Sequence, residues 1–129
     1  MVGGALGSVV GMGVDVVEIG RIERAMRRSA FLERCFTARE RAYAGPGVHA
    51  AQRLAARFAA KEAAIKALGL GGGLSRFTDI EVERERGGGV TLAFNGKARE
   101  RFLELGGTKT HLSFSHGRDI AVAVVVIER

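Results

Sequence analysis

The sequence predicts an α+β fold with a mainly antiparallel sheet, a long central helix and a basic helix near the N-terminus. Two pairs of short β-type segments are joined by tight glycine-containing turns, which is typical of antiparallel hairpins. Between residues 49 and 68 the chain is rich in alanine and has no glycine or proline, which favours one long helix. At 129 residues, we expect a single domain over residues 1–129.

The N-terminal region predicts a strand followed by a helix. Ser8 to Val17 is rich in valine and glycine and ends beside the acidic residues Asp15 and Glu18. Ligand groups often collect at strand ends. From Ile19 to Ala30 apolar residues recur at helical spacing with arginines on the other faces, so we expect one basic amphipathic helix.

The next region predicts two helices and a loop. Thr37 followed by Glu40 is a capping-box signature for a short helix that ends before the Gly-Pro-Gly sequence at 45–47. The long helix is expected from His49 to Leu68, with Gly69 as its terminating glycine. The glycine-rich stretch 69–73 is then a loop. It follows a helix, so it is not a Walker-type phosphate loop.

The C-terminal half predicts two hairpins separated by one helix. The stretch Ile120 to Ile127 is apolar on both faces, so we expect its strand to be central in a sheet or covered by another subunit. The expected segments are the strands Thr78–Arg84 and Val90–Phe94, a helix capped by Asn95 and ending at Leu105, and the strands Thr108–Ser115 and Asp119–Ile127.

The net charge of +6 comes from one segment of the chain. Arg21 to Arg57 contains nine arginines against three glutamates, whereas the remaining charges cancel. Such a basic face attracts a polyanion, which can be nucleic acid, a phosphate-bearing ligand or an acidic protein. The alternative is a solvated charged face without a partner.

Cysteine usage and hydropathy limit the cellular setting. The single cysteine, Cys35, excludes an intramolecular disulfide and a thiolate zinc cluster within one chain, so we expect a cytoplasmic protein with Cys35 as a core thiol. The longest apolar run, Ile120 to Ile127, has eight residues, far fewer than the ~20 of a membrane-spanning helix. No membrane partner is expected.

Asp15 and Glu62 are the candidate metal ligands. One carboxylate from a strand end and one from a helix are the minimal protein contribution to a Mg²⁺ site, because magnesium takes its other oxygens from water and substrate phosphates. The alternative is that Glu62 and Lys66, four residues apart on the helix, form a surface ion pair. Lys61 falls on the apolar face of the same helix, and that alternative does not explain it.

The segment HLSFSH carries a second set of candidate ligands. Strand alternation places His111, Ser113 and Ser115 on one face, where their donors suit a phosphate or a nucleotide base. The alternative is a solvated outer strand face.

Four segments also carry a resemblance: GMGVDVVEIGRI (11–22), FTARE (36–40), ARFAAKEAAIKALG (56–69), and HLSFSH (111–116) followed by AVAVVVIE (121–128). In this order and spacing they resemble holo-acyl-carrier-protein synthase, the family of small bacterial 4′-phosphopantetheinyl transferases. The resemblance covers nearly the whole chain and implies the fold of those enzymes. It also implies that phosphopantetheine is transferred from coenzyme A to a serine of an acidic apo-acyl carrier protein in fatty acid biosynthesis.

Further expectations rest on the same resemblance. They are Mg²⁺ as cofactor, release of adenosine 3′,5′-bisphosphate, and a homotrimer with active sites between subunits. The general base stays open. By position, the resemblance implies Asp15 and Glu62 as Mg²⁺ ligands and catalytic residues, Lys66 as a catalytic residue beside the pyrophosphate, Arg21 and Arg28 as carrier-protein contacts, and Arg57, Lys66, Gly69, Gly71, His111 and Ser115 as coenzyme contacts.

Two other classes of protein fit part of the pattern. A nucleic-acid-binding module would use the same basic helix, but the chain has one tyrosine and no tryptophan to stack on bases, so we expect no nucleic-acid partner. A Mg²⁺-dependent phosphohydrolase would share Asp15 and Glu62 but would need no acidic protein partner.

Overall fold

The computed structural model describes residues 7–71 and 77–129. Helices and antiparallel strands combine in this part of the chain, which confirms the predicted α+β class. In chain order the elements are β1 (Val9–Glu18), α1 (Ile19–Ala25), α2 (Ser29–Cys35), α3 (Ala38–Ala44), α4 (Ala50–Leu68), the 3-10 helix η2 (Phe77–Asp79), β2 (Ile80–Arg84), β3 (Val90–Phe94), α5 (Gly96–Glu104), β4 (Lys109–His116) and β5 (Ile120–Glu128).

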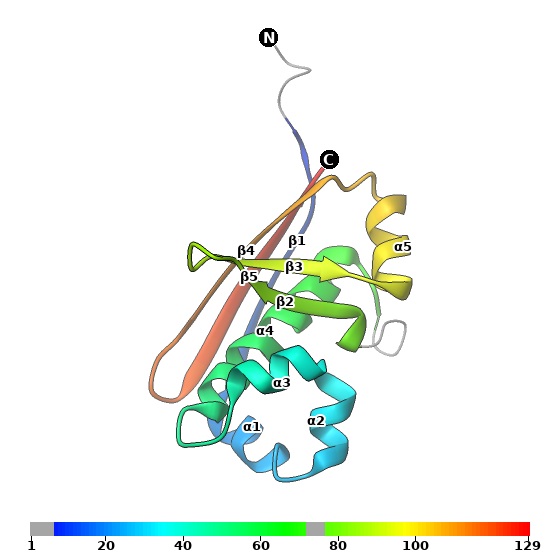
Figure 1. The fold of residues 1–129 in the computed structure, drawn as a ribbon. Helices are drawn as coiled ribbons and strands as arrows, with labels where there is room; N and C mark the ends of the chain where they lie inside the picture. Colours follow the sequence, from blue (N-terminus) through cyan, green and yellow to red (C-terminus); the bar gives the residue numbers. More distant parts are fainter. Residues whose placement is uncertain (1–6, 72–76) are drawn as a thin grey trace.

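The strands form a three-stranded sheet and a separate hairpin (Figure 1). In the larger sheet β5 lies between β1 and β4, and both pairings are antiparallel. Strands β2 and β3 pair with each other, and β3 lies against β4. Both predicted hairpins are therefore confirmed. Within residues 7–71 and 77–129, no helix combines the length and apolar character needed to cross a bilayer.

Helix α4 packs against β1 at a distance that only glycine permits. A Cβ atom on Gly13 would lie 1.9 Å from the carbonyl oxygen of Ala63, and one on Gly11 would lie 2.1 Å from that of Ala67. The glycines therefore let the backbone of β1 touch the helix. Because alternate strand residues share a face, this close approach also places Asp15 beside α4.

The sheet face that points away from α4 is apolar and exposed. It carries Met12, Val14 and Val16 of β1 together with Ile120 and Val124 of β5, whose exposed fractions range from 37% to 62%. The other face of β5 is fully buried against α4. The prediction of a central last strand is thus confirmed, and its outer face is open in the single chain.

The predicted helix from Ile19 to Ala30 is wrong in its second half. Helix α1 ends at Ala25, and after a turn the chain begins a new helix at Ser29. This turn brings the ring centroid of Phe31 to 6.0 Å from that of Phe58 on α4. Burial of aromatic surface in the core outweighs the weak local preference for a continuous helix.

Most of the predicted helix ends are confirmed. The hydroxyl of Thr37 accepts a hydrogen bond from the Glu40 N–H at 3.1 Å, and the Thr37 N–H donates to the Glu40 carboxylate at 2.9 Å. Gly69 ends α4 in the left-handed conformation, with φ of 70°. Asn95 lies at the start of α5, but its side chain makes no capping hydrogen bond. Residues 72 and 73 of the predicted loop lie outside the described residues.

Cys35 lies in the core with 5% of its surface exposed, as the core-thiol interpretation predicts. Burial raises the pKa of its thiol, so the reactive thiolate is disfavoured. The cysteine therefore has a packing role.

Candidate active site

Asp15 and Lys66 meet where β1 crosses α4. The Lys66 ammonium lies 2.9 Å from Oδ1 of Asp15 and donates a second hydrogen bond to the carbonyl oxygen of Val14 at 3.1 Å. The side chain of Asp15 is 17% exposed and that of Lys66 is 53% exposed. The carboxylate is thus partly enclosed, whereas the lysine reaches it from the solvent side.

Glu62 lies one turn before Lys66 on α4 and is half-buried. Burial raises the pKa of Glu62, the negative charge of Asp15 raises it further, and Lys66 and Arg21 act in the opposite direction. The alternative interpretation, a Glu62–Lys66 surface ion pair, does not describe the structure, because among the described residues Lys66 pairs with Asp15. The close approach of β1 brings a competing carboxylate to the lysine.

The arrangement has the donor set of an open cation site. Within the described ranges, no three His, Cys, Asp or Glu side chains cluster closely enough to enclose a metal ion. Asp15 and Glu62 are two carboxylates of like charge, and after burial the charge of Asp15 is the second cause of the raised pKa of Glu62. Two carboxylates with open positions suit a hard cation that keeps water or substrate oxygens.

A basic cavity of about 480 Å³ opens along α1. Arg21, Arg24 and Arg28 line it, with Phe31 and Phe58 beneath them. Helix α1 directly follows β1, the strand that carries Asp15, and the positive charge of Arg21 acts to lower the pKa of Glu62. Arg21 and Arg28, which the sequence singled out, therefore line one cavity on the helix that follows the Asp15 strand.

A second cavity, of about 370 Å³, lies between α3, α4 and the β2–β3 hairpin. Arg57 is only 3% exposed at its wall, and its guanidinium carbon lies 4.2 Å from the centre of the Tyr43 ring. Arg84 lies 5.0 Å from the same ring. Burial lowers the pKa of Arg57, and its Nη2 atom has no hydrogen-bond partner among the described residues. Arg57 is thus a buried cation at the cavity wall, and one of its donor atoms is unsatisfied within the described part of the chain.

The sequence pattern missed Tyr43 and Arg84 as companions of Arg57. They come from α3 and β2, so no local periodicity relates these three positions. Tyr43 lies within the basic segment from Arg21 to Arg57 and Arg84 lies outside it, so that segment does not single out either residue.

His111 and Ser115 lie away from the carboxylate pair. The register pairs His111 with Val126 and Ser115 with Val122, so both side chains lie on the sheet face that points away from α4. Asp15 pairs with Ala123 on the opposite face. Both β4 side chains are exposed, and the His111 ring nitrogen lies 2.5 Å from the carboxylate of Glu128. Within one chain, the structure does not bring them to Asp15.

Gly69 and Gly71 follow the end of α4, beyond Lys66. Gly69 is the left-handed terminating residue, and Gly71 is exposed at the edge of the described range. They lie at the same end of the helix as Lys66.

Comparison with known proteins identifies the family. A family model described as "4'-phosphopantetheinyl transferase superfamily" matches residues 11–125. A relative from Koribacter versatilis, named holo-[acyl-carrier-protein] synthase, is 46% identical over 124 residues, which cover 93% of this chain and 98% of the relative.

Solved structures agree with this comparison. A holo-(acyl-carrier-protein) synthase from Bacillus anthracis, in complex with CoA (3',5'-ADP), superposes with a TM-score of 0.77 and is 38% identical, covering 93% of this chain and 96% of that one. A Chronobacterium ammoniagenes ACPS-CoA complex gives a TM-score of 0.80 at 32% identity, covering 91% and 95% of the two chains. The chain therefore belongs to the holo-acyl-carrier-protein synthase family of the 4′-phosphopantetheinyl transferase superfamily.

Proposed function

We propose that this chain transfers the 4′-phosphopantetheine group of coenzyme A to a serine of an apo-acyl carrier protein, with Mg²⁺, releasing adenosine 3′,5′-bisphosphate. The observation that carries the proposal is the convergence of Asp15, Glu62 and Lys66 where β1 crosses α4. Relatives solved with coenzyme A support the choice of donor. We also propose that the enzyme is a single domain, that it lies in the cytoplasm, and that it serves fatty acid biosynthesis.

Asp15 and Glu62 fit a magnesium ion. Their mutual repulsion favours a cation between them, and Mg²⁺ characteristically takes one or two carboxylates and fills its remaining positions with water and phosphate oxygens. When bound, the ion would neutralise charge on the pyrophosphate of coenzyme A. The chain's own contribution is to hold both carboxylates in place, through the strand–helix contact at Gly13.

Lys66 is placed to assist the leaving group. In the transfer, the serine oxygen bonds to the phosphorus that carries the pantetheine arm, and the bond from that phosphorus to the bridging pyrophosphate oxygen breaks. Negative charge then grows on the departing bisphosphate. The exposed ammonium of Lys66 can turn from Asp15 to that oxygen and stabilise the charge. The general base is left open, and Glu62 is one residue of this chain that could accept the serine proton.

The basic cavity along α1 fits the acidic partner. Arg21 and Arg28 are exposed around this cavity, on the helix that directly follows the Asp15 strand, so a carrier protein docked there could present its serine to the site. Opposite charges across such a surface mainly accelerate association.

The cavity around Arg57 fits the nucleotide end of coenzyme A. Arg57 lies at the cavity wall with an Nη2 that has no partner among residues 7–71 and 77–129, and its guanidinium charge would favour an anionic phosphate in this cavity. Arg39 and Arg84 line the same cavity together with Glu40, Glu83 and Glu85. Arg39 is paired with Glu83 at 3.3 Å, so Arg57 and Arg84 are the arginines that a phosphate would meet. An arginine-lined pocket of this kind is suited to phosphate recognition.

A trimer would bring together two groups of site residues that lie apart in one chain. One group is Asp15, Glu62 and Lys66, and the other is His111 and Ser115. His111 and Ser115 share a sheet face with exposed Met12, Val14 and Val16, and exposed apolar patches mark protein interfaces. A second copy packed on this face would bring its own residues to these β4 side chains. The number three rests on the family resemblance, and the exposed apolar face supports assembly.

The proposed activity is tested by incubating the protein with coenzyme A, Mg²⁺ and a purified apo-acyl carrier protein, then measuring the carrier by mass spectrometry. We expect the mass of one phosphopantetheine group to be added. The addition should disappear with EDTA and with a carrier whose acceptor serine is replaced by alanine. A carrier that stays unmodified, although the Bacillus anthracis relative modifies it, would contradict the proposal.

A further inference from the structure

Glu40 and Lys61 form an ion pair in the interior of the molecule. The Lys61 ammonium lies 2.6 Å from the Glu40 carboxylate, and the exposed fractions of the two residues are 0% and 1%. Desolvation of two charges commonly offsets their attraction, so a buried pair is weak evidence for a gain in stability. Its role must therefore come from its other contacts.

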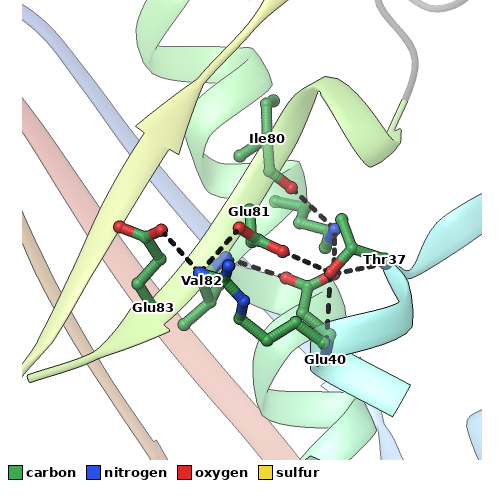
Figure 2. Close-up of polar contacts among 8 residues, drawn as sticks. Thr37, Glu40, Ile80, Glu81, Val82 and Glu83 are labelled. Atoms are coloured by element: carbon green, nitrogen blue, oxygen red, sulfur yellow. Dashed lines mark hydrogen bonds and ion pairs between the residues drawn. The ribbon is translucent and has the colours of Figure 1, made fainter. Parts of the chain in front are cut away.

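The pair binds the backbone of the segment that leads into β2. Lys61 donates to the carbonyl oxygens of Ile80 at 2.7 Å and Phe77 at 3.0 Å, so all three of its N–H donors have acceptors. The second oxygen of Glu40 accepts a hydrogen bond from the N–H of Val82 at 2.8 Å. Figure 2 shows the Glu40 carboxylate between the start of α3 and strand β2.

These backbone groups lie on the free edge of β2. Successive strand residues point their backbone groups to alternate edges, and Asp79 accepts a hydrogen bond from Asn95 on the β3 side. Ile80 and Val82 lie an odd number of residues after Asp79 in the chain. Their backbone N–H and C=O groups therefore point to the other edge of β2, away from β3. The ion pair therefore takes the place of a neighbouring strand and fastens β2 to α3 and α4.

The same three elements form the cavity around Arg57. Arg57 lies one turn before Lys61 on α4, Tyr43 lies one turn after Glu40 on α3, and Arg84 ends β2. Glu40 itself lines the cavity. The position of β2 against the two helices thus sets the spacing of the three side chains.

We propose that Glu40 and Lys61 are positioning residues for coenzyme A. Their contacts with the free edge of β2 hold Arg84 opposite Arg57, and the width of the cavity depends on them. This inference rests on the proposed function, in which the cavity receives the nucleotide end of the coenzyme. Neither residue touches the reacting phosphate, so the effect falls on binding.

The test replaces the pair with two apolar side chains, Glu40→Met with Lys61→Met. Apolar replacement of a whole buried pair is often neutral for stability, so we expect the double variant to fold. Its affinity for adenosine 3′,5′-bisphosphate, measured by calorimetry, should fall about tenfold, and its KM for coenzyme A should rise by the same factor. The kcat at saturating coenzyme A should change less than about threefold.

Two further variants separate positioning from general stability. Ala98→Gly weakens α5 at its buried residue, away from the cavity, and it should lower the melting temperature without changing the bisphosphate affinity. Lys61→Arg keeps the charge but has a planar donor group, so it should weaken binding less than the double variant does. It also tests the proposal if the double variant does not fold.

The outcomes distinguish the positioning role of Glu40 and Lys61 from the assignment of the cavity to the coenzyme. Wild-type bisphosphate affinity in the folded double variant, or in Lys61→Arg if only that variant folds, would overturn the positioning role alone. Arg57→Ala tests the cavity assignment directly. If Arg57→Ala also leaves bisphosphate affinity unchanged, the cavity assignment fails and the positioning role fails with it.

Discussion

The ammonium of Lys66 lies 2.9 Å from Oδ1 of Asp15 and so joins α4 to β1. The charge of the same Asp15 also raises the pKa of Glu62. Asp15 therefore attracts Lys66 as an ion-pair partner and repels the carboxylate of Glu62. In the proposed reaction a cation at the two carboxylates would release Lys66 toward the coenzyme phosphates.

Loss of either carboxylate should stop transfer. Asp15→Ala and Glu62→Ala are each expected to reduce kcat/KM by about a hundredfold or more, because the proposed Mg²⁺ loses a fixed position. Circular dichroism should show an intact fold. Transfer is followed by mass spectrometry of the carrier, and normal transfer by either variant at saturating Mg²⁺ would contradict the metal assignment.

Lys66→Ala should affect the chemical step more than coenzyme binding. Its charge is most valuable when the leaving group becomes more anionic, so kcat is expected to fall by about 10² to 10³ while KM for coenzyme A changes little. Steady-state kinetics with varied coenzyme A separates the two constants. A raised KM with unchanged kcat would mean that Lys66 only anchors the ground state.

Glu62→Gln should stabilise the protein while stopping transfer. The raised pKa of Glu62 means that, between the ordinary carboxylate pKa and the raised one, the folded protein binds more protons than the unfolded chain. The stability contribution of this group therefore falls as pH rises through that window. We expect the metal-free variant to be more stable than the wild type at neutral pH, because glutamine does not carry the charge whose burial is unfavourable. Urea unfolding from about pH 5 to 8 measures this, and an unchanged pH dependence would contradict it.

Charge reversal on α1 should slow association with the carrier protein. Arg21→Glu or Arg28→Glu is expected to lower the on-rate about tenfold at low salt and to weaken its salt dependence, because electrostatic steering acts on encounter. Stopped-flow binding to an acidic carrier measures the rate, with coenzyme A affinity of Arg28→Glu as the control. If the two variants modify the carrier at the wild-type rate in low salt, these arginines form a solvated charged face and have no docking role.

A charge on the open sheet face should disrupt assembly. Val14→Glu places a carboxylate among exposed apolar side chains, so we expect the variant to sediment as a monomer and to lose transfer. Val48→Glu is the matched control, because Val48 is 86% exposed in the loop before α4. Sedimentation velocity distinguishes the states. A wild-type protein that is monomeric and fully active would contradict the trimer.

Local signals in the sequence determined most of the elements. The reciprocal hydrogen bonds of Thr37 and Glu40, the alternation of apolar and charged residues in β2, and the terminating Gly69 each involve residues close in the chain. Such interactions are encoded by short-range spacing, so a pattern predicts them. The family motifs likewise marked Asp15 and Glu62 as candidates before their positions were known.

Tertiary structure alone decided how these residues meet. The break before α2 depends on aromatic packing against Phe58, the partner of Lys66 depends on the approach of β1, and the cavity around Arg57 draws on three elements. The burial of Lys61 with Glu40 also joins positions far apart in the chain. These outcomes depend on which surfaces are buried together, and burial energy is set by contacts between distant segments that no local spacing records.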